Sequence, residues 1–220
     1  MAMEGRTVIA TDTSDLMRLS QWLSPSFPVS AYAYSHGLEA EIVGGRVTDS
    51  AGLEAWLTHV LRAGTGRSDA ILLRAARHQD ADFVSDFALA LASSAERVEE
   101  MMAQGRAFAE TRQAMGQGDG VARPLPVAVG VACRDLWLDD GTVVSLYLQA
   151  FIGNLVAAAV RFIPLGQADG QACLARLHPV IRPVVAETES ADLDDIGQSM
   201  FGADLAAMEH ETLETRLFRS

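Results

Sequence analysis

Residues 143–163 read VVSLYLQAFIGNLVAAAVRFI, an apolar stretch long enough to cross a lipid bilayer. Polar side chains interrupt it at Gln149, Asn154 and Arg161, and no basic flank is present to orient it in a membrane. Pro164 follows directly and should end a helix that begins upstream. We therefore interpret this stretch as a helix buried in the core of a globular protein.

Helical spacing of apolar residues continues outside this core helix. In GLEAWLTHVLRAG, residues 52–64, apolar side chains recur at i, i+3, i+4, i+7 and i+8, which is the pattern of one helix face. Asp49 or Ser50 can cap the start of this helix, and Gly64 can end it. Further helices are expected at 67–79, at 82–115 with a break near Ser93 and Ser94, and at 127–137, 167–178, 192–200 and 203–215.

Alternating strand patterns are scarce, and no run of β-branched residues is bounded by hairpin turns. The sequence therefore predicts an all-α fold, a single-domain bundle of roughly nine or ten helices joined by short loops. We expect residues 1–220 to form this one domain, with residues 1–14 disordered. Residues 204–220 are expected to be a flexible C-terminal tail that docks on a partner.

Charge and composition exclude several classes of function. The 220 residues carry a net charge of −12, which argues against binding to nucleic acid or to anionic membrane surfaces. All 17 basic residues are arginine, so the chain has no lysine for a P-loop, a Schiff base or a Ser-Lys pair. The N-terminal residues MAMEGRTVIATDTSD contain no signal-peptide core, and we expect a cytoplasmic protein.

The residues that usually bind metals or catalyse reactions are few and dispersed. Cys133 and Cys173 are 40 positions apart with no other cysteine, and we interpret them as small buried hydrophobic residues. The 5 histidines form no HxH, HxxxH or HExxH pattern, and no GxSxG motif is present. The sequence therefore predicts no catalytic residue, no metal site and no cofactor.

Two stretches differ from ordinary helix-core sequence, and the first is LSPSFPVSAYAYSHGLEAE, residues 23–41. Pro25 and Pro28 stiffen the chain, and a helix should begin near Ser35 or His36. The tyrosine hydroxyls could satisfy buried amides of a rigid loop, or the tyrosines could anchor an interface. The candidate partner-binding residues of this stretch are Tyr32, Tyr34, Ser35, His36 and Glu39.

The second stretch is the C-terminal sequence EHETLETRLFR, residues 209–219. Chain termini usually fray and are polar, whereas here two arginines bracket a leucine and a phenylalanine. These side chains could pack on the chain's own core, or the segment could order on a partner. The candidate partner-binding residues of the tail are His210, Glu211, Arg216, Leu217, Phe218 and Arg219.

Four ordered motifs carry a resemblance to a known family. They are SPSFPVSAYAYSHGLE near the start, GNLVAAAVRFIPLGQADGQ and LARLHP in the second half, and HETLETRLFRS at the end. Together they resemble the urease accessory protein UreF family over nearly the whole chain, from about Leu16 to Ser220. The chain departs from that family at Leu213 and Glu214, where a Gln-Tyr pair is common, and at Ser30 and Ala31, where glycines are common.

The resemblance implies an all-helical protein without an active site of its own. Proteins of this family act in nickel delivery to urease: they form homodimers, bind the accessory protein UreD (also called UreH) and recruit the GTPase UreG. The resemblance further implies that nickel is handled by the assembled complex and that the tail orders against the UreD-type partner. A role in regulating GTP hydrolysis, including an arginine finger, is a hypothesis for which the sequence singles out no residue.

Two rival interpretations come from other functional classes. A helical enzyme could use a cleft built from Tyr32, Tyr34, His36 and nearby acids, and the isolated protein would then turn over a small substrate. A nickel-binding metallochaperone would bind metal tightly and stoichiometrically on its own. The scaffold interpretation explains the tail, the tyrosine-bearing loop and the missing catalytic set together, and we adopt it.

Overall fold

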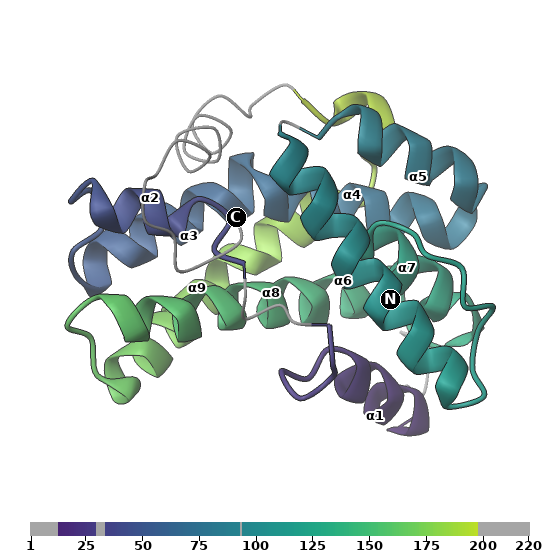
Figure 1. Cartoon of the computed structure of the whole chain (residues 1–220), viewed down its shortest axis with the longest axis horizontal. Coiled ribbons are helices and arrows are strands. Elements are labelled where there is room, and N and C mark those ends of the chain that lie inside the picture. Colours follow the sequence, from purple (N-terminus) through teal and green to yellow (C-terminus); the bar gives the residue numbers. More distant parts are fainter. Residues whose placement is uncertain (1–12, 30–33, 93, 198–220) are drawn as a thin grey trace, which may run out of the picture.

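The computed structural model describes residues 13–29, 34–92 and 94–197, and helix α8 (Asp140–Phe162) runs along the middle of the bundle (Figure 1). Asp139 caps its start by accepting a hydrogen bond from the Thr142 backbone N–H at 2.8 Å. By length and composition α8 could cross a membrane, but 50% of its apolar window is buried inside the protein. The interpretation of this stretch as a core helix is confirmed, because its buried face belongs to the main hydrophobic core.

The elements that surround α8 are also helical. Within the described residues there is no strand, and the predicted all-α fold is confirmed. The other helices are α1 (Thr13–Trp22), α2 (Leu38–Val43), α3 (Ser50–Ala63), α4 (Thr65–His78), α5 (Ala81–Ala90), α6 (Ala95–Ala114), α7 (Leu125–Ala132) and α9 (Gln167–Glu187), with short 3-10 helices η2 (Cys133–Asp135) and η3 (Leu193–Asp195).

The predicted helix starts and breaks are mostly confirmed. Asp49 caps α3 by accepting from the Gly52 N–H at 2.8 Å. The break expected near Ser94 separates α5 from α6, and Ser94 caps α6 through the Arg97 N–H. Helix α2 begins at Leu38, two or three positions later than predicted, because His36 and Gly37 both take the left-handed conformation, with φ of 53° and 82°.

Two predicted helices in the C-terminal part were wrong in extent. Helix α9 passes the predicted end at residue 178 and contains Pro179 and Pro183. The buried stripe continues through Leu177, Ile181 and Val184, and Pro179 lies on the exposed face, where water can bond a freed carbonyl. At 192–197 only the 3-10 turn of η3 forms, ending before Gly197 at φ 110°. The helix predicted at 203–215, and residues 198–200, lie outside the described residues.

Exposure does not follow hydrophobicity everywhere in α5 and α6. Phe83 of α5 is 57% exposed although its side chain is large and apolar. On α6 the buried stripe includes Glu100, Met101, Gln104 and Phe108, so the inward face of this helix carries two polar side chains among apolar ones. A periodicity of apolar residues alone could not show this, because it treats every charged position as outward.

The contact between α4 and α7 depends on Gly130, which has no side chain. A Cβ atom added to Gly130 would lie 2.5 Å from the Leu73 carbonyl oxygen and 2.8 Å from Ala76 Cβ. Both neighbours belong to α4, so the two helix backbones approach closely at this point. Gly153 of α8 has more space, because its nearest neighbour would be a Leu174 methyl group at 3.9 Å.

We predict that Gly130→Ala lowers the free energy of unfolding by about 1–3 kcal/mol, because the added methyl group overpacks the α4–α7 contact. Gly153→Ala is the matched control, and it should be neutral or stabilise by up to ~1 kcal/mol through helix propensity. Urea unfolding followed by circular dichroism measures both. Equal stability of the two variants would contradict the close approach of α4 and α7.

Candidate functional site

A group of buried and partly buried polar side chains joins the loop before α2 to three helices. We call His36, Asp69, Arg97, Glu100 and Tyr147 the buried charge cluster. Arg97 of α6 is central: its guanidinium lies 3.2 Å from Asp69 Oδ1 of α4 and 3.2 Å from Glu100 Oε2. Tyr147 of α8 donates its hydroxyl to Asp69 Oδ2 at 2.7 Å. The cluster therefore connects α4, α6 and α8 through charge rather than through apolar packing.

His36 attaches the loop to this cluster with both ring nitrogens. Its Nε2 lies 2.8 Å from Glu100 Oε1, and its Nδ1 lies 3.3 Å from Arg97 Nη1. A neutral imidazole protonated at Nε2 satisfies both contacts, since Nε2 then donates and Nδ1 accepts. The ring also meets Phe151 of α8 edge-on, with the ring centroids 4.9 Å apart. Backbone strain at φ 53° is thus balanced by contacts on several sides of the side chain.

Burial and the neighbouring charges together set the pKa values of Asp69, Arg97 and Tyr147. Burial raises the pKa of the Asp69 carboxyl above its usual range, although Arg97 and the Tyr147 hydroxyl oppose this. Burial alone would lower the pKa of Arg97, but Glu100 and Asp69 more than compensate and raise it. Burial and the nearby Asp69 raise the pKa of the Tyr147 phenol well above its usual value, so Tyr147 remains a hydrogen-bond donor.

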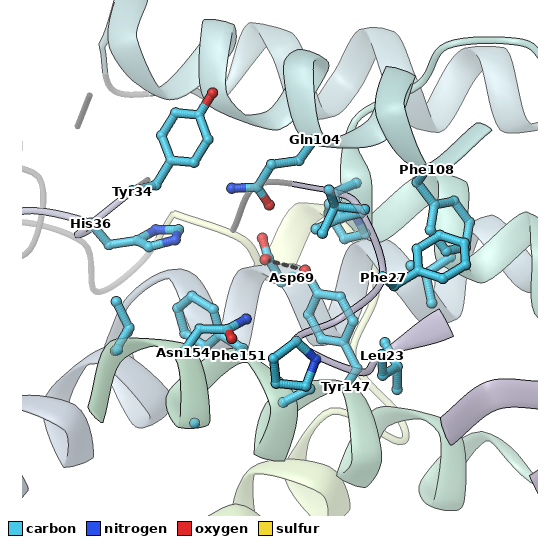
Figure 2. A pocket seen from close by; sticks show the side chains of 18 of the residues that line it. Leu23, Phe27, Tyr34, His36, Asp69, Gln104, Phe108, Tyr147, Phe151 and Asn154 are labelled. Atoms are coloured by element: carbon cyan, nitrogen blue, oxygen red, sulfur yellow. Dashed lines mark hydrogen bonds between the residues drawn. The ribbon is translucent and has the colours of Figure 1, made fainter. Parts of the chain in front are cut away.

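The cluster borders a cavity of about 270 Å³. In Figure 2, His36, Gln104 and Asp69 lie on one side of this cavity, and Phe27 and Phe108 lie on the other. Gln104 supports the polar side by donating to Glu100 Oε1 at 3.0 Å. The cavity thus has a polar wall formed by the loop, α4 and α6, and an apolar wall formed by α6, α7, α8 and the segment after α1.

Metal and thiol chemistry finds little support in the described part of the chain. Within residues 13–29, 34–92 and 94–197, no group of three or more His, Cys, Asp or Glu side chains could hold a metal ion. Cys133 and Cys173 are free and fully buried, which confirms their interpretation as buried hydrophobic residues. Burial raises the pKa of the Cys133 thiol to about 12, so it does not form the thiolate that binds metals.

The predicted partner-binding residues fall into two groups. Tyr34, Ser35 and Glu39 are buried, and Ser35 accepts the Glu39 backbone N–H at 3.3 Å, which starts α2. Tyr34 and His36 line the cavity. The second group lies outside the described residues and comprises Tyr32, His210, Glu211, Arg216, Leu217, Phe218 and Arg219. The partner-binding role of both groups stays a prediction.

Sequence reasoning missed Asp69, Arg97, Glu100, Gln104 and Tyr147. A usable signal was present on α6, where Glu100, Gln104 and Phe108 recur at intervals of four and so share one helix face. Charged or amide side chains aligned with a core phenylalanine indicate a buried polar contact.

The fold and the site together define a class: an all-α protein in which a loop is fastened to a helical bundle by buried charge. Comparison with known proteins gives the family. A family model for UreF matches residues 47–178. The chain is 57% identical to the urease accessory protein UreF of Jannaschia sp. (strain CCS1) over 94% of its length and 96% of that relative. It is 52% identical to the UreF of Cereibacter sphaeroides (strain KD131) over 93% of its length and 98% of the relative.

The UreF of Roseobacter denitrificans (strain ATCC 33942) is 44% identical over 98% of this chain. The chain therefore belongs to the urease accessory protein UreF family, and the resemblance found in its motifs is confirmed.

We predict that Tyr147→Phe lowers the free energy of unfolding by about 1–3 kcal/mol, because buried Asp69 loses its neutral donor without a change in packing volume. Ser145→Ala on the same helix is the control. Its hydroxyl donates to the Gly141 carbonyl of its own helix at 2.6 Å, and its loss should change stability by less than about 0.5 kcal/mol. If both variants unfold at the wild-type urea concentration, Asp69 does not depend on Tyr147.

We also predict that neither cysteine reacts with Ellman's reagent at pH 8 in the native protein, because both thiols are buried and burial raises the pKa of the Cys133 thiol to about 12. Both should react at once in guanidinium chloride, which serves as the internal control. Rapid labelling of the native protein would show that the core opens around α7 or α9.

Proposed function

We propose that this chain is a urease maturation factor that works as a non-catalytic scaffold. The observation that carries the proposal is identity of 57% over 94% of the chain to a protein named urease accessory protein UreF. The relatives named here match from 93% to 98% of the chain, so the proposal covers the whole protein rather than a shared module. Nickel is then the cargo of the assembled complex and not a resident cofactor of this chain.

In finer detail, the scaffold forms a homodimer in the cytoplasm, binds the UreD (UreH) accessory protein and recruits the GTPase UreG. Through this complex it meets the urease apoprotein and regulates GTP hydrolysis during nickel insertion. The net charge of −12 supports assembly with basic partner surfaces and disfavours nucleic acid.

The proposed docking surface has two parts with different physical characters. The loop around residues 34–39 is fastened to the bundle as a preorganised element, and its Tyr34, Ser35 and Glu39, which are buried in the free chain, must become exposed to contact a partner. The tail offers Arg216 and Arg219 for bidentate charge-assisted bonds and Leu217 and Phe218 as an apolar anchor.

We predict that the full chain forms a complex with its cognate UreD-type partner and that removal of residues 210–220 abolishes it. Size-exclusion chromatography with light scattering measures both the complex and the homodimer. The paired variants Leu217→Ser with Phe218→Ser, and Arg216→Gln with Arg219→Gln, separate the apolar contribution from the charged one.

A complex that is indifferent to truncation would move the docking site to the loop around residues 34–39. No complex with the full chain would contradict the scaffold proposal. Turnover by the isolated chain, or tight stoichiometric nickel binding by it, would favour the enzyme or the metallochaperone instead.

A further inference from the structure

We propose that the cavity beside the buried charge cluster binds an uncharged small molecule that has a compact apolar body and one hydroxyl or N–H group. The cavity has a volume of about 270 Å³, and residues of α6, α7, α8 and the segment after α1 line it. This site goes beyond the scaffold proposal and does not depend on it, because every residue that it uses belongs to this chain.

The size of the cavity and its apolar wall favour a compact apolar body. Phe27 and Phe108 both line the cavity and pack against each other, with the ring centroids 5.5 Å apart. Val129 of α7 and Leu155 of α8, each 1% exposed, extend this wall. An engineered apolar cavity of about 150 Å³ in another protein binds benzene, so the larger volume here can hold a fused pair of aromatic rings.

Two side-chain amides supply free hydrogen-bonding groups inside the cavity. Gln104 of α6 is 6% exposed; its Nε2 donates to Glu100, and its Oε1 has no partner among the described residues. The side-chain amide of Asn154 on α8 likewise forms no hydrogen bond with a described residue. Figure 2 shows that Gln104 and Asn154 reach into the cavity from different sides. A hydroxyl between them can donate to Gln104 and accept from Asn154.

The charges beside the cavity are already paired, which favours an uncharged ligand. Arg97 lies between Asp69 and Glu100, and His36 satisfies its two contacts as a neutral imidazole. An ion that entered here would lose its hydration without gaining a free opposite charge. Arg161 also lines the cavity, but it is an exposed residue whose charge water can solvate.

Exposed residues at the rim leave the cavity open to solvent. Pro25 and Ala157 line the cavity and are exposed, so a small molecule can enter without unfolding the core. In the free chain water must bond to Gln104 Oε1, because an unpaired buried acceptor is costly. A ligand with a hydroxyl or N–H group replaces that bond, whereas a purely apolar ligand leaves the acceptor unpaired.

Equilibrium dialysis of the full chain against three naphthalene derivatives tests the chemistry of the site. The probes are β-naphthol, its methyl ether, which has no donor, and β-naphthoate, which is charged at pH 7. We expect saturable binding of β-naphthol at one site, about tenfold or more tighter than either of the other probes. No saturable binding of β-naphthol, equal affinity for β-naphthol and its methyl ether, or tighter binding of β-naphthoate would each overturn the inference.

The variant Gln104→Met tests the hydrogen bond separately from any effect on stability. It removes the acceptor, so the preference for β-naphthol over its methyl ether should disappear. The preference is a ratio of two affinities measured on the same variant, and a merely structural role of Gln104 would lower both affinities and leave the ratio unchanged. An unchanged ratio would therefore contradict a contact between Gln104 and the ligand.

Three variants of α8 locate the bound probe. Ala150 is half-buried and lines the cavity, so Ala150→Leu should fill the space and weaken binding of β-naphthol about tenfold or more. Asn154→Leu removes a free amide at similar volume and should weaken it about fivefold, with wild-type urea unfolding because no internal hydrogen bond is lost. Gln149→Leu, half-buried but outside the cavity, is the control and should bind as the wild type does. Wild-type affinity in Ala150→Leu would place the probe elsewhere and overturn the site.

Discussion

The arrangement of the helices in this protein depends on the ion pairs of the Arg97 guanidinium. It is buried beside two carboxylates, Asp69 and Glu100, which approach it from α4 and from its own helix. Transfer of these charges from water is costly, and only their close pairing with added hydrogen bonds offsets that cost. The pairing therefore requires α4, α6, α8 and the loop at His36 to be in place together, which favours one arrangement of the bundle over looser ones.

The helices themselves could be predicted from the sequence because their causes are local. Residues only a few positions apart determine the apolar stripe of α3, its cap at Asp49 and the cap of α6 at Ser94. The core position of α8 followed from an apolar run with too many polar interruptions for a membrane. Family membership could be recognised for a different reason, since motif order reflects ancestry rather than physics.

The site could not be predicted, because its contacts connect residues far apart in the chain. Nothing near Asp69 shows that it will meet Tyr147, and nothing near His36 shows that it will meet Arg97. The full length of α9 was missed as well, because the cost of a proline inside a helix depends on whether the freed carbonyl faces water or the core. Such outcomes are set by tertiary packing, which a single-sequence periodicity does not contain.

The wide separation of these contacts has a consequence for synthesis on the ribosome. His36 meets Arg97 61 positions later, and Asp69 meets Tyr147 78 positions later. At about 5–20 residues per second, the segment at 34–39 waits on the order of ten seconds before its anchors have emerged. During vectorial synthesis this tyrosine-bearing segment is therefore a nascent-chain element without its native partners. The N-terminal part of the protein can complete its native contacts, which include Tyr147 and Phe151, only after the helix at 140–162 has been synthesised.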